Sequence, residues 1–486
     1  MVIKLHDTLS REVKALEKRA GERYQLYVCG PTVYGPAHIG NFITFTRFDV
    51  LYRTLQVAGY EPYYVRNITD VDDKTIRRSL EEGLSLLQFT QRWTDKFHED
   101  CGALNLLTPD VEPRATDHIK EQIELVEELL KKGHAYVGGD GSVYYRVTSF
   151  ADYGKLAHFD PEQLRSQDTN SAGTANLADE YEREAVADFA LWKAHKTEDG
   201  PNLWQGPKHP ETGKEIAGRP GWHLECSAMS MRYLGPSFDL HGGGEDLCFP
   251  HHENEIAQSE AATGQPFCRH WMHSTHLLVE GKKMSKSLGN FFTIDDLLEK
   301  GYSPAAIRLA FLQGHYRQQF NFTLSGIAAA QSGLEKLEKG LLPLLEKSGM
   351  SREEFGQLVP PFAGDLGEFE NAWKALCHDL NTPAALGSLF SAVKRASKRI
   401  ESADEARAAL QGAATLLYAL GIPLFTAKEE EPEAVEVPAE IAELAEKRWQ
   451  AKQSRDFAAA DALRAELTAK GWQILDRKDG YDVVKG

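Results

Sequence analysis

The sequence predicts an α/β protein: a parallel-sheet domain with an insertion, followed by an α-helical bundle and a small C-terminal α+β unit. Three observations support this class. A strand–loop–helix–strand pattern lies near the N-terminus, helical periodicity dominates after about Ile307, and a charged linker precedes the last segment. At 486 residues the chain exceeds one ordinary domain, so three or four are expected.

The N-terminal pattern is the strongest fold signal. Gln25 to Cys29 is a short apolar run, Asn41 to Ala58 has apolar residues at helical spacing, and Pro62 to Ile68 is a second apolar run. Strand, loop, helix and strand within about 45 residues form the βαβ unit of a Rossmann-like parallel sheet. Such sheets bind nucleotides where the first strand meets the helix N-terminus.

The middle of the chain is less regular. Leu80 to Leu106 and Thr116 to Lys132 are predicted to be amphipathic helices, and Ser142 to Val147 a short strand. The segment from Asp160 to Glu184 lacks periodicity and is predicted to be an exposed loop. His276 to Val279 is a further strand candidate.

The last third has helical spacing. The predicted bundle helices are Leu334 to Leu345, Phe369 to Leu376, Pro383 to Ile400 and Ala403 to Leu420. Lys428 to Pro438 is a charged linker without a core-forming pattern. In the closing unit we expect helices at Ile441 to Lys452 and Phe457 to Lys470, Gly471 as a C-cap, and strands at Trp472 to Leu475 and Tyr481 to Val484.

Composition restricts the class of protein. No run approaches the roughly 20 apolar residues of a membrane span, and the N-terminus lacks a signal-like apolar segment, so we expect a cytoplasmic protein without membrane contact. Six scattered cysteines favour reduced thiols, some bound to metal. The formal charge of −17 argues against indiscriminate nucleic-acid binding but allows selective binding of a structured RNA.

The stretch from Trp222 to Glu255 combines cysteine, histidine and carboxylate with three successive glycines. Zn²⁺ prefers these ligand types, so a zinc site beside a phosphate- or ribose-binding loop is predicted. His251 and Glu255 are spaced i, i+4 and would share one face of a helix that begins after Pro250. Competing ligand candidates nearby are Cys248, His252, Glu253, His223 and His241.

Two short motifs point to a nucleotide. His38 to Asn41 (HIGN) lies at the first strand-to-helix junction, where such side chains donate to phosphate oxygens; alone, an ordinary turn explains it better. Lys283 to Ser287 (KMSKS) predicts a cationic loop that grips a triphosphate and neutralises leaving pyrophosphate, with a solvated Lys/Ser loop as the alternative. Together the two motifs favour ATP chemistry.

These two motifs resemble the paired signatures of class I aminoacyl-tRNA synthetases. Further stretches narrow the resemblance to the cysteinyl-tRNA synthetase family: YVCGPTVY (Tyr27 to Tyr34), RNITDVDDK (Arg66 to Lys74), GWHLECSAM (Gly221 to Met229) and FPHHENEIAQ (Phe249 to Gln258). The resemblance extends over essentially the full chain, including LNTPAAL (Leu380 to Leu386). The chain departs from the common pattern at Asn41, where many class I enzymes have histidine; both side chains can donate to phosphate.

The resemblance implies one Zn²⁺ per chain and assigns its ligands to Cys29, Cys226, His251 and Glu255. Serine differs from cysteine by one atom, which shape alone discriminates poorly. Zinc binds a thiolate strongly and an alcohol weakly, so the ion would select the substrate. A purely structural zinc is the alternative.

The resemblance also implies a two-step ligation. The carboxylate of cysteine attacks the α-phosphate of Mg²⁺-bound ATP, and pyrophosphate leaves. The cysteinyl group of the adenylate then passes to tRNA(Cys), and catalysis depends on positioning and electrostatics. The residues assigned to catalysis are His38, Asn41, Lys283 and Lys286. The residues assigned to ATP are His38, Gly40, Asn41, Gly243, Asp246 and Lys286; for the glycine run at His241 to Leu247, plain turn glycines are the alternative.

Three residues are candidates for the cysteine pocket. Trp222 is a candidate lid over the small side chain, or equally a core tryptophan. Thr69 and Asp70 follow the second strand, where parallel sheets place ligands; for Asp70 a buried structural hydrogen bond is the alternative.

The expected division follows the resemblance: residues 1–124 and 218–280 form the two halves of the catalytic domain, 125–217 the connective insertion, 281–330 the KMSKS loop and stem-contact region, 331–427 a tRNA-binding bundle, 428–438 a linker, and 439–486 an anticodon-binding unit. We expect a monomer with tRNA(Cys), L-cysteine and ATP as partners. Two rivals stay open, a tRNA-independent ligase that joins cysteine to an amino sugar and a non-catalytic RNA-binding paralogue.

Overall fold

The structure is a computed structural model. It describes residues 1–18, 21–159, 188–284, 289–358, 366–425, 438–454, 456–470, 472–477 and 480–485. The chain divides into two compact units, Met1–Leu424 and Phe425–Gly486, which are described separately. The predicted loop at Asp160 to Glu184, most of the predicted linker, and Gly471 lie outside the described residues.

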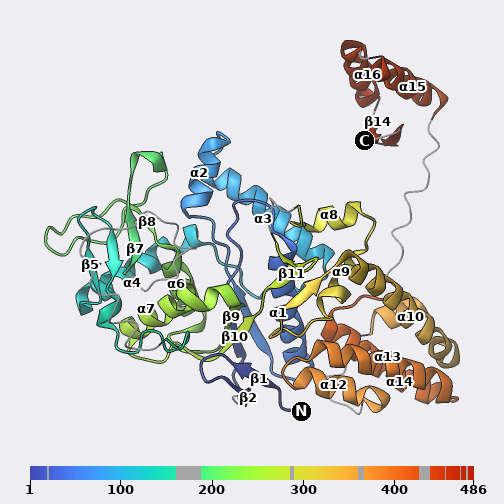
Figure 1. The fold of residues 1–486 in the computed structure, drawn as a ribbon, viewed down its shortest axis with the longest axis horizontal. Coiled ribbons are helices and arrows are strands. Elements are labelled where there is room, and N and C mark those ends of the chain that lie inside the picture. The colour runs from blue at the N-terminus through green and yellow to red at the C-terminus, as the bar shows by residue number, and fades with distance from the viewer. Residues whose placement is uncertain are drawn as a thin grey trace. The chain divides into compact units, whose positions relative to one another are not determined.

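A four-stranded parallel sheet forms the centre of the first unit (Figure 1). Its strands are β3 (Tyr24–Val28), β4 (Pro62–Arg66), β9 (Phe238–Gly244) and β10 (Cys268–Ser274), in the order β10-β9-β3-β4. Helix α1 (Ile39–Val57) connects β3 to β4, which confirms the predicted βαβ unit. Parallel pairing brings the carboxyl ends of all four strands to one edge, the edge at which such sheets bind ligands.

Helices connect the remaining strands. They are α2 (Asp73–Glu81), α3 (Leu86–Ala103), α4 (Ile119–Lys132), α6 (Trp222–Leu234) and α7 (Glu253–Thr263). The prediction of one helix from Leu80 to Leu106 is wrong. Gly83 adopts a φ of +67°, and the Ser85 side chain caps a new helix, so the chain breaks between α2 and α3.

The insertion has more regular structure than its sequence predicts. A four-stranded antiparallel sheet has the order β5-β6-β7-β8, with strands β5 (Ala135–Val137), β6 (Val143–Tyr145), β7 (Phe189–Ala194) and β8 (Gly218–Pro220). Tyr145, Leu191 and Trp192 are fully buried in its core together with apolar residues of α4 and α6. Strand β6 confirms the strand predicted at Ser142 to Val147, whereas the other three strands are too short for a periodicity of two to reveal them.

After β10 the chain forms a second small sheet, ordered β12-β11-β13. Strands β11 (Leu277–Val279) and β12 (Lys282–Lys283) form a hairpin, and β13 (Phe320–Phe322) pairs with β11 in parallel. Because β13 follows Ile307, the expectation of an all-helical region from there on is wrong for this one segment. Helices α8 (Ile294–Glu299) and α9 (Pro304–Phe311) lie between β12 and β13 in the chain.

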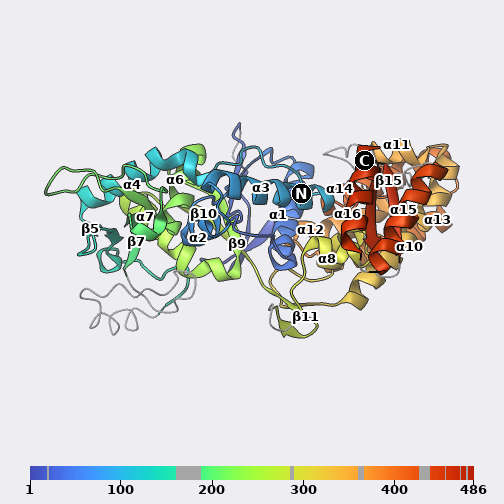
Figure 2. The same ribbon diagram turned by 90° about the horizontal axis from the view of Figure 1, so that it is seen from above.

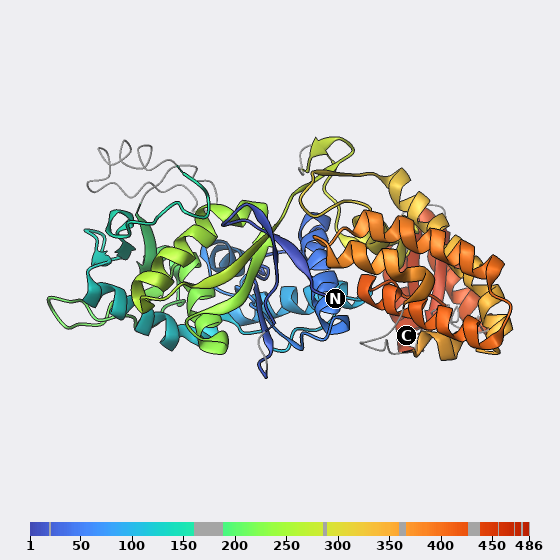
Figure 3. The same cartoon turned by 90° about the horizontal axis from the view of Figure 1, so that it is seen from below.

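The predicted helical bundle is confirmed. It contains α10 (Leu324–Ser348), α11 (Arg352–Gly356), α12 (Glu370–Cys377), α13 (Thr382–Arg399) and α14 (Ala403–Leu420). Figure 2 and Figure 3 show this bundle and the antiparallel insertion at opposite ends of the first unit, with the parallel sheet between them. An N-terminal hairpin, β1 (Lys4–Asp7) and β2 (Glu12–Ala15), packs beside β10.

The second unit has the predicted two helices and two strands. They are α15 (Ala439–Gln453), α16 (Phe457–Ala469), β14 (Trp472–Arg477) and β15 (Gly480–Lys485). Ile441, Ala445, Leu467, Trp472 and Ile474 form its small core. Among the helices that the structure describes in either unit, none is both long and apolar enough to cross a membrane.

Candidate functional site

Four side chains from three separate segments of the chain meet at the carboxyl edge of the parallel sheet. Cys29 directly follows β3, Cys226 lies in α6, His251 precedes α7, and Glu255 lies in its first turn. All four are buried, and one potential ligand atom from each lies within 4.8 Å of the others. The two sulfur atoms are 3.7 Å apart, and His251 Nε2 is 3.1 Å from Glu255 Oε1. Residue types and spacing therefore match a four-ligand metal centre.

Two of the four candidate ligands, Cys226 and Glu255, are favoured in the charged form that binds a metal. Burial raises the pKa of Cys29 well above its usual range, and Glu255 and Cys226, against the effect of burial, raise the pKa of His251 to about 10, so these two residues hold protons that a bound metal would displace. Burial opposes ionisation of Cys226, but the Cys29 thiol and the His251 imidazole hydrogen-bond to its sulfur and lower its pKa to about 6. Burial likewise opposes the Glu255 charge, but His241 and His251 lower the pKa of Glu255 to about 2. A thiolate and a carboxylate thus already face each other in a buried space, and a divalent cation would neutralise them.

Histidines surround these four residues. His241 Nε2 lies 2.9 Å from the outer oxygen of Glu255, and His223 Nδ1 lies 2.9 Å from His251 Nδ1. The second contact occupies the Nδ1 atom of His251 and leaves Nε2 facing the cluster. Such outer contacts orient ligands in metal sites, so this arrangement fits a built centre.

A second set of four overlaps the first. Cys29, His241, His252 and Glu255 also approach within 4.8 Å, with Cys29 Sγ 3.4 Å from His252 Nε2. The two sets share Cys29 and Glu255. His252 Nδ1 lies 2.7 Å from His273 Nε2, so His252 also fits the role of an outer residue.

The HIGN motif opens α1 as a helix cap. The His38 Nδ1 atom accepts a hydrogen bond from the Asn41 backbone at 3.3 Å, and the Asn41 Oδ1 atom accepts from the His38 backbone at 3.1 Å. A methyl group added to Gly40 would lie 3.1 Å from the Met284 side chain, so the KMSKS motif begins directly against the HIGN turn. The structure therefore brings the two motifs together.

The lysine-bearing hairpin lies at the edge of this region. Lys283 is exposed at the end of β12, whereas Lys286 lies outside the described residues. Asn290 is buried and donates to the Val279 and Lys283 carbonyls, both at 3.2 Å, which ties the two sides of the loop together.

The glycine run forms the end of β9. A Cβ atom on Gly242 would come within 2.3 Å of the Phe48 ring, and one on Gly243 within 2.8 Å of Leu247, so both positions require glycine for close packing. Asp246 is exposed beyond the strand end, 3.8 Å from His276 Nε2. The run thus lies at the same sheet edge as the HIGN turn.

The pocket candidates differ in their contacts. The half-buried Trp222 ring stacks on the His251 ring with centroids 4.2 Å apart, which places it directly against the cluster. Thr69 is buried. The Asp70 carboxylate accepts from the backbone and hydroxyl of Thr116 at 2.9 and 2.6 Å, which favours the structural alternative for this residue.

Sequence reasoning missed three polar residues at this edge. Asn67 Oδ1 accepts from the Gly30 backbone at 2.8 Å and lies 3.7 Å from Cys226 Sγ. His273 was missed because it lies in a strand outside the motif stretch. Burial, reinforced by the charge of Cys226 and neighbouring carboxylates, raises the pKa of Glu225 well above its usual range. Glu225 is adjacent to a ligand candidate in sequence, a signal that was available.

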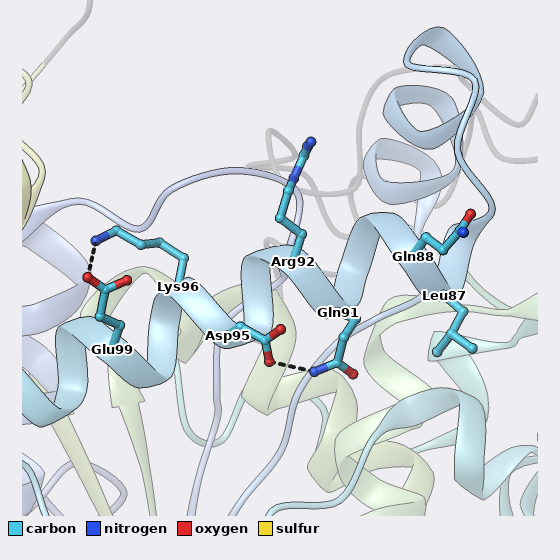
Figure 4. A pocket seen from close by; sticks show the side chains of 7 residues that line it. All are labelled: Leu87, Gln88, Gln91, Arg92, Asp95, Lys96 and Glu99. Carbon is cyan, nitrogen blue, oxygen red and sulfur yellow. Dashed lines mark hydrogen bonds and ion pairs between the residues drawn. The ribbon is translucent and has the colours of Figure 1, made fainter. Parts of the chain in front are cut away.

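A shallow hollow of about 670 Å³ lies along α3, away from this site (Figure 4). Its lining residues are Leu87, Gln88, Gln91, Arg92, Asp95, Lys96 and Glu99. The hollow contains none of the motif residues. Some of its polar side chains pair along the helix, as Gln91 and Asp95 do at 2.6 Å, and Arg92 pairs with Glu82 outside the hollow.

The fold and the two converging motifs define a class I aminoacyl-tRNA synthetase. Similar solved structures include a Mycobacterium tuberculosis methionyl-tRNA synthetase (15% identity, TM-score 0.55, covering 83% of this chain and 92% of that one). Another is an Agrobacterium radiobacter leucyl-tRNA synthetase complex (13% identity, TM-score 0.58, covering 84% of this chain and 85% of that one). A family model described as "tRNA synthetases class I (C) catalytic domain" matches residues 15–332, and a "DALR domain" model matches 373–424.

Full-length relatives narrow the class. The cysteine–tRNA ligase of Opitutus terrae is 49% identical, with 99% of each chain covered. That of Chlamydia caviae is 42% identical, covering 99% of this chain and 97% of the relative. The chain belongs to the cysteine–tRNA ligase family.

Proposed function

We propose that this chain ligates L-cysteine to tRNA(Cys) in an ATP-dependent reaction through a cysteinyl-adenylate, and that Cys29, Cys226, His251 and Glu255 hold one Zn²⁺ ion. The observation that carries the proposal is the buried cluster of two thiols, an imidazole and a carboxylate at the nucleotide-binding edge of the sheet. When bound there, zinc supplies a centre that prefers a thiolate over a hydroxyl and lowers the pKa of a thiol.

Two observations favour this ligand set over the overlapping one. The pKa of Cys226 is lowered toward the thiolate, which is the form that binds zinc. His241 already has a partner role, because it contacts the oxygen of Glu255 opposite the one that faces His251. In the proposed site His241 and His252 orient ligands rather than bind the ion.

Several residues of this chain have separate roles in the first step, the formation of the adenylate. His38 and Asn41, fixed by their mutual cap, donate to the phosphates of ATP at the N-terminus of α1. Lys283, on the hairpin, and Lys286, three residues later in the sequence, stabilise the charge that develops on the α-phosphate and on pyrophosphate. Mg²⁺ accompanies ATP as part of the substrate.

The remaining site residues shape the two pockets. Gly40 and Gly243 allow the nucleotide to approach the backbone, and Asp246 accepts from a ribose hydroxyl. Trp222 closes over the cysteine side chain from its position on the His251 ring, and the buried Thr69 is a further residue of this pocket. Asp70, whose carboxylate accepts from Thr116, supports the pocket structurally.

The segments take the roles that the resemblance implies. Residues 1–124 and 218–280 carry activation, 125–217 the connective insertion, and 281–330 the lysine loop and stem contacts; 331–427 and 439–486 hold the tRNA body and anticodon on either side of the linker 428–438. The protein acts as a cytoplasmic monomer. Charging of purified tRNA(Cys) separates this function from a ligase with an amino-sugar acceptor.

Metal content and substrate choice test the proposal together. We expect about one zinc per wild-type chain and strong preference for cysteine over serine in ATP–pyrophosphate exchange. Cys226→Ser and His251→Ala should lose the metal and, because a buried recognition partner is gone, most cysteine activation. His252→Ala is the matched variant for the overlapping set and should retain more metal than either. If the metal-free protein rejects serine equally well, the zinc proposal fails.

A further inference from the structure

Arg47 stands out among the buried charges near the site. It lies in the middle of α1, the helix that begins at His38, and is only 2% exposed. Its Nη1 atom donates to the Ser274 hydroxyl at 2.7 Å and to the Thr275 carbonyl at 2.8 Å. Its Nε and Nη2 atoms have no hydrogen-bond partner among the residues that the structure describes.

The other deeply buried arginines in the described part of the first unit differ from Arg47. Each of them pairs with a carboxylate: Arg53 and Arg308 with Asp49, Arg66 with Glu112, and Arg219 with Asp73. Arg47 lies against a hydroxyl and a carbonyl instead. Burial lowers its pKa to about 10, so the side chain stays charged at neutral pH. A buried, unpaired cation destabilises a fold, and such costs persist where the geometry serves a function.

The two acceptors of Arg47 lie at a junction. Ser274 is the last residue of β10 and pairs in register with Gly244, at the end of the glycine run. Thr275 and His276 then lead into β11, the first strand of the hairpin that carries Lys283. On its other side, the Thr275 backbone donates to the Tyr316 carbonyl at 2.8 Å. Arg47 therefore fixes the root of the lysine hairpin to the helix that begins with the HIGN turn.

We propose that Arg47 is a positioning residue that sets the β11–β12 hairpin, which carries Lys283 and leads into the rest of the KMSKS motif, relative to α1 and the phosphates held at the N-terminus of that helix. This inference rests on the proposed roles of Lys283 and Lys286. It assigns no contact with substrate to Arg47. The helix contributes His38 at one end, and its third turn holds the strand end from which the opposing lysines depart.

A double-mutant cycle in cysteine-dependent pyrophosphate exchange tests the inference. Arg47→Met preserves length and apolar packing, and we expect exchange to fall roughly 10- to 100-fold, as expected when reacting groups are misplaced by about an ångström. Adding Lys286→Ala should then lower exchange less than about fivefold further, against at least ~100-fold in the wild-type background. If Arg47→Met only reduced the fraction of active protein, Lys286→Ala would still lower exchange by its full factor in the Arg47→Met background. A full-size effect in both backgrounds overturns the inference.

Stability provides the matched contrast. Arg47→Met should leave the apparent melting temperature within about 2 °C of wild type, or raise it, since replacing an unpaired buried charge by a well-packed apolar chain is often neutral or stabilising. Arg53→Met on the same helix breaks a pair with Asp49 and should lower it clearly, while keeping the Lys286→Ala effect at full size. If Arg47→Met is insoluble, the same cycle is run with Ser274→Ala, which removes one acceptor, and non-additivity of the same sign is required.

Limited trypsinolysis separates failure of this inference from failure of the proposed function. Cleavage after Lys282 and Lys283, identified by mass spectrometry, should be faster in Arg47→Met than in wild type, and Arg47→Lys should restore part of the difference. Equal cleavage rates overturn the inference whatever the role of the lysines. Absence of a Lys286→Ala effect in wild type, with faster cleavage in Arg47→Met, overturns the lysine assignment and leaves the anchoring of the hairpin root supported.

Discussion

The site has a thiol side, formed by the cluster around Cys226 and Glu255, and a phosphate side, formed by the HIGN turn, Lys283 and Asp246. The two sides differ in how deeply their side chains are buried. On the thiol side every candidate ligand is buried, and their outer contacts, such as that of His241 with Glu255, are also buried. On the phosphate side Lys283 and Asp246 are exposed, and hydrogen bonds fix the HIGN turn and the base of the lysine loop rather than these side chains.

This difference matches what each side must do. Discrimination of a thiol from a hydroxyl depends on a rigid ligand geometry, which buried packing supplies. Phosphates enter and leave during each reaction cycle, so their partners must be accessible and gain full strength only as water is excluded. The part of the site that selects the amino acid is therefore rigid, and the part that handles ATP is accessible.

The largest expected effect lies on the phosphate side. Lys286→Ala should slow adenylate formation by at least ~100-fold, the size expected when one donor to a developing charge is lost. Cysteine-dependent pyrophosphate exchange measures this, with Lys282→Ala as the neighbouring-lysine control. Unchanged exchange in Lys286→Ala would show that this lysine does not stabilise the phosphates during adenylate formation.

An intermediate effect is expected on the thiol side. His241→Ala removes the partner of Glu255 without removing a proposed ligand, and should weaken zinc affinity by roughly 10- to 100-fold. Competition with a zinc chelator measures the affinity, and His158→Ala, an exposed histidine, is the control. Complete loss of the metal in His241→Ala would instead place His241 among the ligands and favour the overlapping set.

The smallest expected effect is a pH dependence of thermal stability that comes from Asp7, a residue of β1 beside β10. Burial works against ionisation of Asp7, but Lys14, the Trp271 backbone on β10 and Ser10 lower its pKa from 3.8 to about 2. The folded pKa is below the unfolded value, so the stabilisation is present above about pH 4 and is lost as the pH falls toward 2.

We therefore expect the melting temperature of wild type to exceed that of Asp7→Asn at neutral pH, with the difference shrinking between about pH 4 and 2. Thermal denaturation across this range measures the difference. A gap that stays constant with pH would mean that the lost contacts, rather than the charge, stabilise the hairpin β1–β2 against β10.

Strong hydrophobic periodicity, with glycine and proline at the ends of elements, made much of the fold predictable. The βαβ unit, the bundle helices and the closing unit follow from local pattern. The apolar residues of α1 and α14 recur at helical spacing, and Gly421 ends α14 in a left-handed conformation. In the insertion only β6 was predicted, as the strand Ser142 to Val147. The sheet itself was not, because β6 pairs with β7, and β7 with β8, across long stretches of sequence.

By itself, the sequence determined the kinds of chemistry present: thiol, imidazole and carboxylate in one stretch, and lysines and a helix-capping histidine elsewhere. Only the tertiary structure decided which of them meet. Parallel pairing of β3 with β9 helps bring Cys29 to Cys226 across nearly 200 residues. The structure brings together two overlapping sets of four, whereas the motif left several ligand candidates open and the family resemblance implied one set. The role of Arg47 was likewise invisible in the sequence, because an arginine at a helical spacing reveals neither its burial nor its missing partner. Contacts of this kind depend on strand order and burial, which no local pattern encodes.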